Sequence, residues 1–172
     1  MPIYALGDIE PKIATSAFIH PDAVIIGAVS VGEYSSIWPC AVLRGDTNTI
    51  TVGARTSIQD GAIVHCTADL ATAIGDDCTI GHNAHLEGCT VESGVLIGSG
   101  SLVLHRVHVH SGALVAAGAV CTQGLIVPAD SLAVGVPARI KEGAADKATM
   151  EYSAKSYQTL AKRYPQELRR LD

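Results

Sequence analysis

The stretch VESGVLIGSGSLVLHRVHVHSGALVAAGAV, residues 91–120, decides the fold of this chain. An aliphatic residue returns at every sixth position, and a small residue (Ala, Ser or Val) stands four places after each one. A period of six is too short for a repeat built from two helices and too regular for ordinary alternating strands. It suits a triangular prism in which each hexad supplies one short strand and one corner, so that three consecutive hexads complete a coil.

The same period extends toward the N-terminus as far as Ile19, with two breaks. The segment TNTIT at 47–51 interrupts it, and LATA at 70–73 inserts four residues between hexads. Beyond residue 120 the series closes in Pro-bearing turns before Ile140. We predict an all-β domain over 1–140, in which inward Val, Ile, Leu and Ala pack between coils. Their burial stabilises the fold by roughly 25 cal/mol per Å² of apolar surface.

The pattern changes after Lys141. Apolar residues then alternate at spacings of four and three, as on one face of an amphipathic helix. We therefore predict a C-terminal helix within 141–172 that packs on the prism or on a neighbouring subunit, and we expect Pro165 to kink it or to start a second segment. The residues of this apolar face are Met150, Ala154, Tyr157, Ala161, Tyr164, Leu168 and Leu171.

Composition excludes several classes of function. The net charge of −5 and the scattered Lys and Arg give no basic stripe for nucleic acid or an acidic membrane. No apolar run has the length of a membrane span, and the N-terminus lacks a signal-peptide pattern. Five cysteines without a Cys-x-x-Cys pair indicate reduced, mostly buried thiols. We expect a cytoplasmic protein that binds neither nucleic acid nor membrane.

Histidines cluster in the middle of the chain, where coils stack on one another. His65 and Glu87 are each the second residue of a hexad and are separated by one coil plus the LATA insertion. If the insertion loops out, their side chains stack roughly 4.8 Å apart, which suits shared metal ligation. His82 falls at a corner between them and would have to reach the pair of a neighbouring chain. We predict no role for His105, His108 and His110.

Four segments carry a resemblance to a known family: RGD at 44–46, SIQDGAIVH at 57–65, IGHNAHLEGC at 80–89 and AVGVPARI at 133–140. They resemble the γ-class carbonic anhydrases and their bacterial relatives over nearly the whole chain. The resemblance implies a left-handed parallel β-helix built from hexapeptide repeats. It also implies a homotrimer with metal sites at its subunit interfaces, each holding zinc or ferrous iron and acting on a small-molecule substrate.

The resemblance also assigns ligands and departs from the family at one of them. His65 and His82 match two metal ligands, with His82 donated across the interface, whereas Glu87 stands where the family has His. Two His and one carboxylate still form a catalytic zinc set with a position open for water. The carboxylate cancels one metal charge, so bound water should ionise less readily. His85 is an alternative ligand, with Glu87 then serving as its acceptor.

Further residues match the family around this site. Arg44 and Asp46 match a salt-bridging pair near the interface, and Asp60 matches another carboxylate of that network. Gln59 matches a residue that orients water beside the metal, and Tyr157 matches a tyrosine that approaches from the C-terminal helix.

Three functions remain open at this point. The first is metal-dependent hydration of carbon dioxide to bicarbonate by a carbonic anhydrase-like lyase. The second is acyl transfer or thioester hydrolysis, because hexapeptide β-helices also serve acyltransferases. The third is a non-catalytic trimeric binding or structural protein, which the loss of a ligand at Glu87 would explain.

Overall fold

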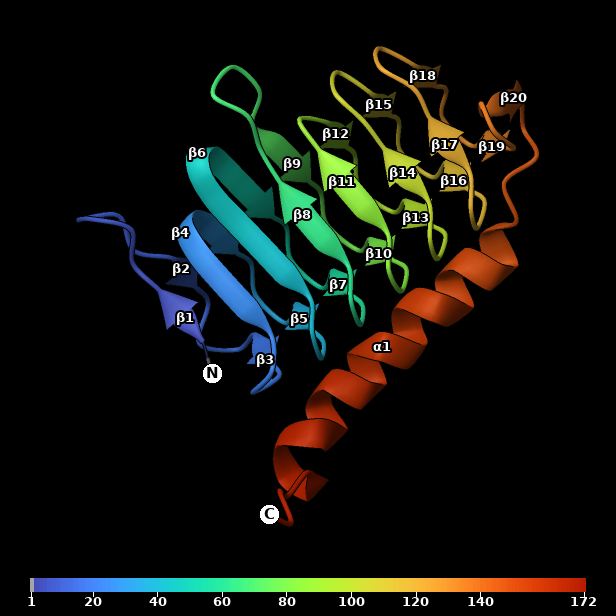
Figure 1. The fold of residues 1–172 in the computed structure, drawn as a ribbon. Coiled ribbons are helices and arrows are strands. Elements are labelled where there is room, and N and C mark those ends of the chain that lie inside the picture. The colour runs from blue at the N-terminus through green and yellow to red at the C-terminus, as the bar shows by residue number, and fades with distance from the viewer. Residues whose placement is uncertain (1) are drawn as a thin grey trace.

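The computed structural model describes residues 2–172 and consists of stacked coils followed by one long helix, α1 (Lys147–Glu167) (Figure 1). Strands of successive coils pair in parallel, and equivalent residues such as Leu96 and Leu114 stand side by side in adjacent coils. Among the strands of residues 2–172, the one antiparallel pair closes the C-terminal end, where β19 (Leu132–Val134) pairs with β20 (Arg139–Lys141). The predicted β-helix with a C-terminal helix is confirmed.

The strands fall into three runs that follow the long axis. The first run comprises β1 (Ile3–Tyr4), β4 (Val24–Val31), β6 (Val42–Val52), β8 (Ile63–His65), β11 (His85–Glu87), β14 (Leu102–Val103) and β17 (Val120–Cys121). The second comprises β2 (Lys12–Ile13), β9 (Thr72–Ile74), β12 (Thr90–Val91), β15 (His108–Val109) and β18 (Ile126–Val127), joined to the first through the long strands β4 and β6. The third comprises β3 (Phe18–Ile19), β5 (Ser36–Ile37), β7 (Ser57–Ile58), β10 (Thr79–Ile80), β13 (Leu96–Ile97), β16 (Leu114–Val115), β19 and β20.

The core is the inward column that the hexads predicted. Most first and fifth residues of the hexads are buried, as with Ile37 and Ala41, both fully inaccessible to solvent, while Ile19 at the start of the repeat is partly buried. Val64 and Leu86 stack in register in the middle of β8 and β11 and are also fully buried. Their neighbours on each strand must then point outward, because successive side chains of a strand alternate between its faces. The core therefore fixes which side chains reach the surface in the candidate site.

The first predicted break is confirmed and the second differs in its bounds. At TNTIT the pairing of β4 with β6 shifts from Gly27–Gly45 to Val29–Ile50, although β6 continues through the segment as one strand. The insertion does loop out, but it begins earlier than LATA: Thr67 and Leu70 form an antiparallel bridge, while Thr72 and Ala73 belong to β9. The physical reason is Thr72, whose hydroxyl donates to the carbonyl of His65 and accepts from the backbone N–H of Gly88.

Helix α1 lies along the third run, against β3, β5, β7 and β10 of its own chain (Figure 1). Asp146 caps its N-terminus by accepting from the backbone N–H of Thr149. Pro165 does not start a second helix, because it sits in the last turn and α1 ends at Glu167. No helix within 2–172 is both long and apolar enough to cross a membrane.

One cysteine departs from the prediction of burial. Cys66, Cys78, Cys89 and Cys121 are buried, and burial raises the pKa of Cys89 to about 12. Cys40 is exposed because it occupies a corner of the prism with a φ of 60° rather than an inward strand position.

Candidate metal centre

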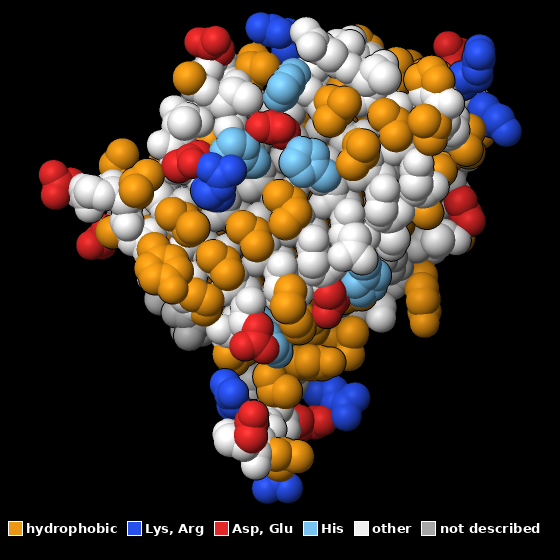
Figure 2. Space-filling view, viewed as in Figure 1, with side chains coloured by type: hydrophobic (Ala, Val, Ile, Leu, Met, Phe, Trp, Pro, Cys, Tyr) orange, Lys and Arg blue, Asp and Glu red, His pale blue; other side chains and the backbone are white. Residues whose placement is uncertain are grey.

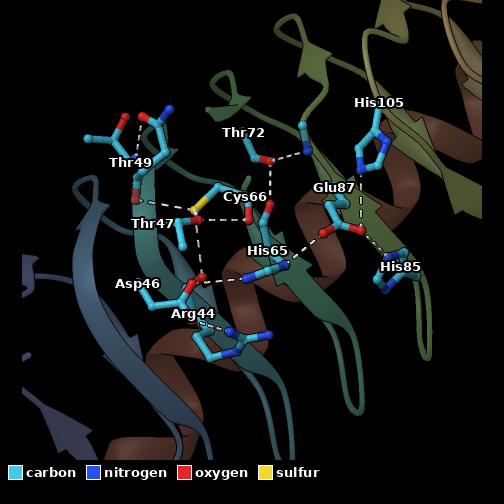
Figure 3. A network of polar contacts seen from close by, with 12 residues as sticks. Arg44, Asp46, Thr47, Thr49, His65, Cys66, Thr72, His85, Glu87 and His105 are labelled. Atoms are coloured by element: carbon cyan, nitrogen blue, oxygen red, sulfur yellow. Dashed lines mark hydrogen bonds and ion pairs between the residues drawn. The ribbon is translucent and has the colours of Figure 1, made fainter. Parts of the chain in front are cut away.

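His65 and Glu87 occupy the last positions of β8 and β11 and are directly paired in register. Arg44 of β6 is the register partner of His65 on its other side. All these side chains point away from the core, so they form one outward row across three adjacent coils (Figure 3). The predicted stacking of His65 and Glu87 is confirmed.

Each ring nitrogen of His65 faces a carboxylate. Nδ1 lies 2.8 Å from Oε1 of Glu87, and Nε2 lies 2.9 Å from Oδ1 of Asp46. Asp46 is in turn held by an ion pair with Arg44, its neighbour but one on β6. The imidazole is therefore fixed from both sides, in the manner of metal-ligating histidines whose second nitrogen is held by a carboxylate.

The electrostatics favour ionised carboxylates at both ends of the imidazole. Partial burial raises the pKa of Glu87, but contacts with His65 and His85 outweigh it and bring the pKa below its ordinary value. The same balance holds for Asp46. Burial raises its pKa, but hydrogen bonds with His65 and Arg44 outweigh this effect and bring the pKa below its ordinary value. Both groups are acceptors at neutral pH, which suits either a protonated imidazole or a bound cation.

The second oxygen of Glu87 faces two more imidazoles. Nε2 of His85 lies 3.5 Å from Oε2 of Glu87, and Nε2 of His105 lies 3.6 Å from the same atom. His85 comes from the same strand, whereas His105 comes from the turn after β14 (Figure 3). The carboxylate of Glu87 therefore faces three imidazoles, those of His65, His85 and His105. The sequence reasoning recognised His85 as a neighbour of Glu87 and missed His105.

His82 sits apart, at the corner between β10 and β11. The corner turns through Asn83, which has a φ of 56° and stacks on Gly61 of the preceding coil. Gly61 has a φ of 69°, and a Cβ there would meet the Asn83 side-chain oxygen at 2.3 Å, so glycine is favoured at this position. Asp60, which precedes Gly61, places its carboxylate oxygen 3.0 Å from Nδ1 of His82.

Tyr157 of α1 holds the other nitrogen of His82, with its hydroxyl 3.1 Å from Nε2. Burial and the charge of Asp60 raise the pKa of Tyr157, so its hydroxyl stays protonated at neutral pH. The ring of Tyr157 is positioned by an edge contact with Trp38, at a centroid distance of 5.3 Å. The indole of Trp38 donates to Ser57 over 3.0 Å, so the β-helix and α1 jointly orient the His82 corner.

The structure therefore brings the predicted residues together in two groups. Arg44, Asp46, His65 and Glu87 form one, and Asp60, His82 and Tyr157 form the other. Gln59 directly follows β7 and precedes Asp60, and its side chain is buried. Within 2–172 the ligand atoms of His65, Glu87 and His82 do not gather into one site. The donation of His82 to another chain's pair stays a prediction.

A different trio does gather. Glu92, His108 and His110 place one ligand atom each within 4.8 Å of the others, the one such grouping found among the described residues. Sequence reasoning assigned no role to these histidines. The signal was the coil length, because Glu92 lies 18 residues before His110 and therefore stacks directly beside it.

Comparisons with known proteins agree with this architecture. The family model "Bacterial transferase hexapeptide (six repeats)" matches residues 10–45 and 71–105. A solved structure titled as a putative acetyltransferase from Bacillus cereus superposes with a TM-score of 0.91 at 36% identity, covering 94% of this chain and 95% of that one.

Relatives with carbonic anhydrase names include an archaeal and a plant protein. "Probable carbonic anhydrase" of Methanocaldococcus jannaschii is 38% identical over 128 residues, which cover 74% of this chain and 80% of the relative. "Gamma carbonic anhydrase 1, mitochondrial" of Arabidopsis thaliana is 42% identical over 168 residues, which cover 93% of this chain. The chain matches only 61% of the length of that plant protein.

These matches define the class of protein as a hexapeptide-repeat β-helix. Within that class, the chain belongs to the γ-class carbonic anhydrase family.

Proposed function

We propose that this protein hydrates carbon dioxide to bicarbonate with a metal ion shared between subunits of a homotrimer. His65 and Glu87 of one subunit and His82 of a neighbouring subunit would hold zinc or ferrous iron. The observation that carries the proposal is the separation of the two groups: each is oriented by its own hydrogen bonds, yet they do not meet within one chain.

The donor set fits a divalent metal. The Nδ1 of His65 and the Oε1 of Glu87 converge, and Asp46 holds the opposite nitrogen of His65, which leaves Nδ1 facing the carboxylate. Imidazole and carboxylate are ordinary ligands of a catalytic zinc, and a carboxylate on the far nitrogen strengthens the histidine as a donor.

The surface beside the pair supports assembly with a second copy. Two residues before His65 and Glu87 on their strands begins an outward row of partly exposed residues, most of them apolar, which follow the same register through the coils. Figure 2 shows hydrophobic side chains gathered around the charged and histidine side chains on this face. The members of the row are Val24, Val42, Ile63, His85, Leu102 and Val120. An apolar patch with charged groups beside it is typical of a protein interface.

The residues of the chain then divide the chemistry. A bound zinc or ferrous ion would lower the pKa of a coordinated water and so supply the nucleophile for carbon dioxide. Asp46 and Arg44 hold the ring of His65, and Asp60 and Tyr157 hold that of His82. Gln59 lies near this second group in sequence, and its amide is suited to orient the attacking oxygen by donating and accepting. Glu87 holds a negative charge at the site, so a metal-bound water would lose its proton less readily than it would beside a third imidazole.

Mixed trimers give the sharpest test of a shared site. The His65→Asn and His82→Asn variants should each be inactive in stopped-flow carbon dioxide hydration. Unfolded, mixed in equal amounts and refolded together, they should regain about one quarter of wild-type activity, because that fraction of interfaces pairs an intact His65 with an intact His82. Each variant refolded alone is the matched control. If the mixture stays as inactive as its components, the shared site is wrong.

Acyl transfer is the second candidate, favoured by the acetyltransferase title of the Bacillus cereus structure. The same preparations separate the two. Acetyl transfer from acetyl-coenzyme A that is unaffected by His65→Asn and His82→Asn, together with no hydration in the wild type, would replace the first proposal with the second. Inactivity of the metal-loaded wild type in both assays would indicate a binding or structural trimer.

A further inference from the structure

We propose a second metal site, built by one chain alone, in which Glu92, His108 and His110 bind a divalent transition-metal ion such as zinc. These three residues form the Glu92 cluster. It lies on the second run of strands, at β12 and β15, whereas the His65–Glu87 pair lies on the first. The proposal therefore does not rest on the trimer or on the proposed activity.

The geometry of the cluster comes from the repeat. His108 and His110 flank the buried Val109, so both imidazoles point outward on the same strand. The rings stack with centroids 4.1 Å apart at an angle of 21°. Glu92 directly follows β12 on the preceding coil, which places its carboxylate beside both rings.

One oxygen of Glu92 faces both imidazoles. Its Oε1 lies 2.8 Å from Nε2 of His108 and 3.0 Å from Nδ1 of His110. Ligands around a tetrahedral zinc stand about 3.3 Å apart, given zinc–nitrogen and zinc–oxygen bonds of about 2.0–2.2 Å. A small outward shift of these partly exposed side chains would make that room. Two imidazoles and one carboxylate match zinc and its neighbours in the first transition row better than magnesium or calcium.

The other oxygen of Glu92 is already anchored. Oε2 accepts from the backbone N–H of Ser111 over 2.9 Å and from its hydroxyl over 2.8 Å. These bonds fix the carboxylate before a metal arrives, which is the role that surrounding donors play at established metal sites. They also lower the pKa of Glu92 to about 2, together with the contact from His108, so the carboxylate is ionised and ready to bind.

Without a metal, the same atoms can form a closed hydrogen-bond network in which both imidazoles donate to Glu92. In the metal-bound state each imidazole would carry its proton on the nitrogen that faces away from the metal, so binding exchanges one tautomer for the other. Zinc binding at the cluster should be lost when the imidazoles are removed.

The test is zinc binding to tag-free protein stripped with chelator, titrated against a chromogenic competitor. The background is His82→Asn, which breaks the shared centre but leaves the Glu92 cluster intact. This protein should bind about one zinc per chain, and the further double change His108→Asn with His110→Asn should abolish that binding. Ser111→Ala should weaken it roughly tenfold, since it removes one of the two anchors of Glu92.

His20→Asn in the same background is the matched control, because it removes an imidazole that also lies beside a carboxylate, 3.7 Å from Asp22. It should bind zinc as the background does. Equal zinc binding with and without His108 and His110, in variants shown by thermal unfolding to be folded, would overturn the proposal. So would a background protein that binds no zinc. Neither outcome bears on the shared centre, which the mixed-trimer experiment tests separately.

Discussion

The His65–Glu87 pair and the Glu92 cluster are made of the same residue types on the same scaffold, yet only one is complete within a chain. Both set an imidazole at the end of a short strand against a carboxylate on the adjacent coil. In the Glu92 cluster the second histidine is two residues away on the same strand, so the repeat alone gathers the ligands. His82, which we propose completes the His65–Glu87 pair across an interface, lies at a corner and contacts Asp60 and Tyr157.

The two groups differ in whether the repeat of one chain brings all the proposed ligands together. A strand presents alternate residues on one face, so a His-x-His pair converges without help. The corner residue His82 does not gather with His65 and Glu87 within residues 2–172, and in the proposed site it meets the pair of a neighbouring subunit. Changes at the corner should therefore affect the shared centre and spare the Glu92 cluster, and the reverse should hold for changes at His108.

The largest effect is expected for His82→Ala. It removes a proposed ligand, so carbon dioxide hydration should fall by at least about 100-fold, the upper range for changes merely around a metal site. Stopped-flow hydration measures this loss. His108→Ala is the paired control and should retain hydration within about twofold of the wild type. Equal losses in both variants would mean that the two regions are not independent.

The next effect concerns the core beneath the pair. Leu86 lies between His85 and Glu87 in β11 and is fully buried. Leu86→Ala should lower the free energy of unfolding by about 2–5 kcal/mol, because it removes apolar contacts and leaves a cavity between coils. Denaturant unfolding measures the loss. Leu102→Ala, at a partly exposed outward position of the neighbouring strand, should cost much less.

A smaller effect is expected at Glu87 itself. Glu87→His restores the family ligand and removes a negative charge, so bound water should ionise more readily. Hydration at neutral pH should rise roughly tenfold for each unit by which the pKa of that water falls. Glu87→Gln separates charge from ligation, since it removes the charge without supplying an imidazole. No gain from Glu87→His would show that the carboxylate is a tolerated ligand or lies outside the metal site.

Much of this comparison follows from the sequence. The period of six and the length of a coil predicted that His65 and Glu87 would stand side by side, and they pair in register. The boundaries of the insertion were wrong because they depend on hydrogen bonds of Thr72, which periodicity does not report. The contact of Asp46 with His65 depends on side-chain orientation, so the match to a salt-bridging pair did not reveal it.

The Glu92 cluster was missed for a different reason. Its spacing is regular, and the coil length that aligned His65 with Glu87 also aligns His110 with Glu92. The resemblance to a family directed attention to positions that match known ligands, and His108 and His110 match none. Applying the repeat length to every His and carboxylate would have found the cluster. The position of His82 relative to a partner chain, in contrast, depends on a surface that one chain does not define.

The smallest effect separates the two regions by pH. The Ser111 and His108 contacts lower the pKa of Glu92 from 4.5 to about 2 in the folded protein, so its ionised form is stabilised by folding. That stability is fully present above the unfolded value and is lost as the pH falls through about 4.5 toward 2. Glu92→Gln lacks this contribution, so with chelator present its deficit in unfolding free energy should be constant at neutral pH and shrink across that window.

Thermal or denaturant unfolding of both proteins between neutral pH and acid measures this deficit, and it should be small because the carboxylate is partly exposed. Glu10→Gln, at an exposed position near the N-terminus and distant in sequence from Glu92, is the control. Its unfolding free energy relative to the wild type should not change across this pH range. A deficit that stays the same down to the lowest pH would mean that Ser111 and the imidazoles do not hold Glu92 ionised. The cluster would then lack the anchored carboxylate on which the proposed metal site depends. It would be a group of surface histidines beside a carboxylate, unlike the His65–Glu87 pair.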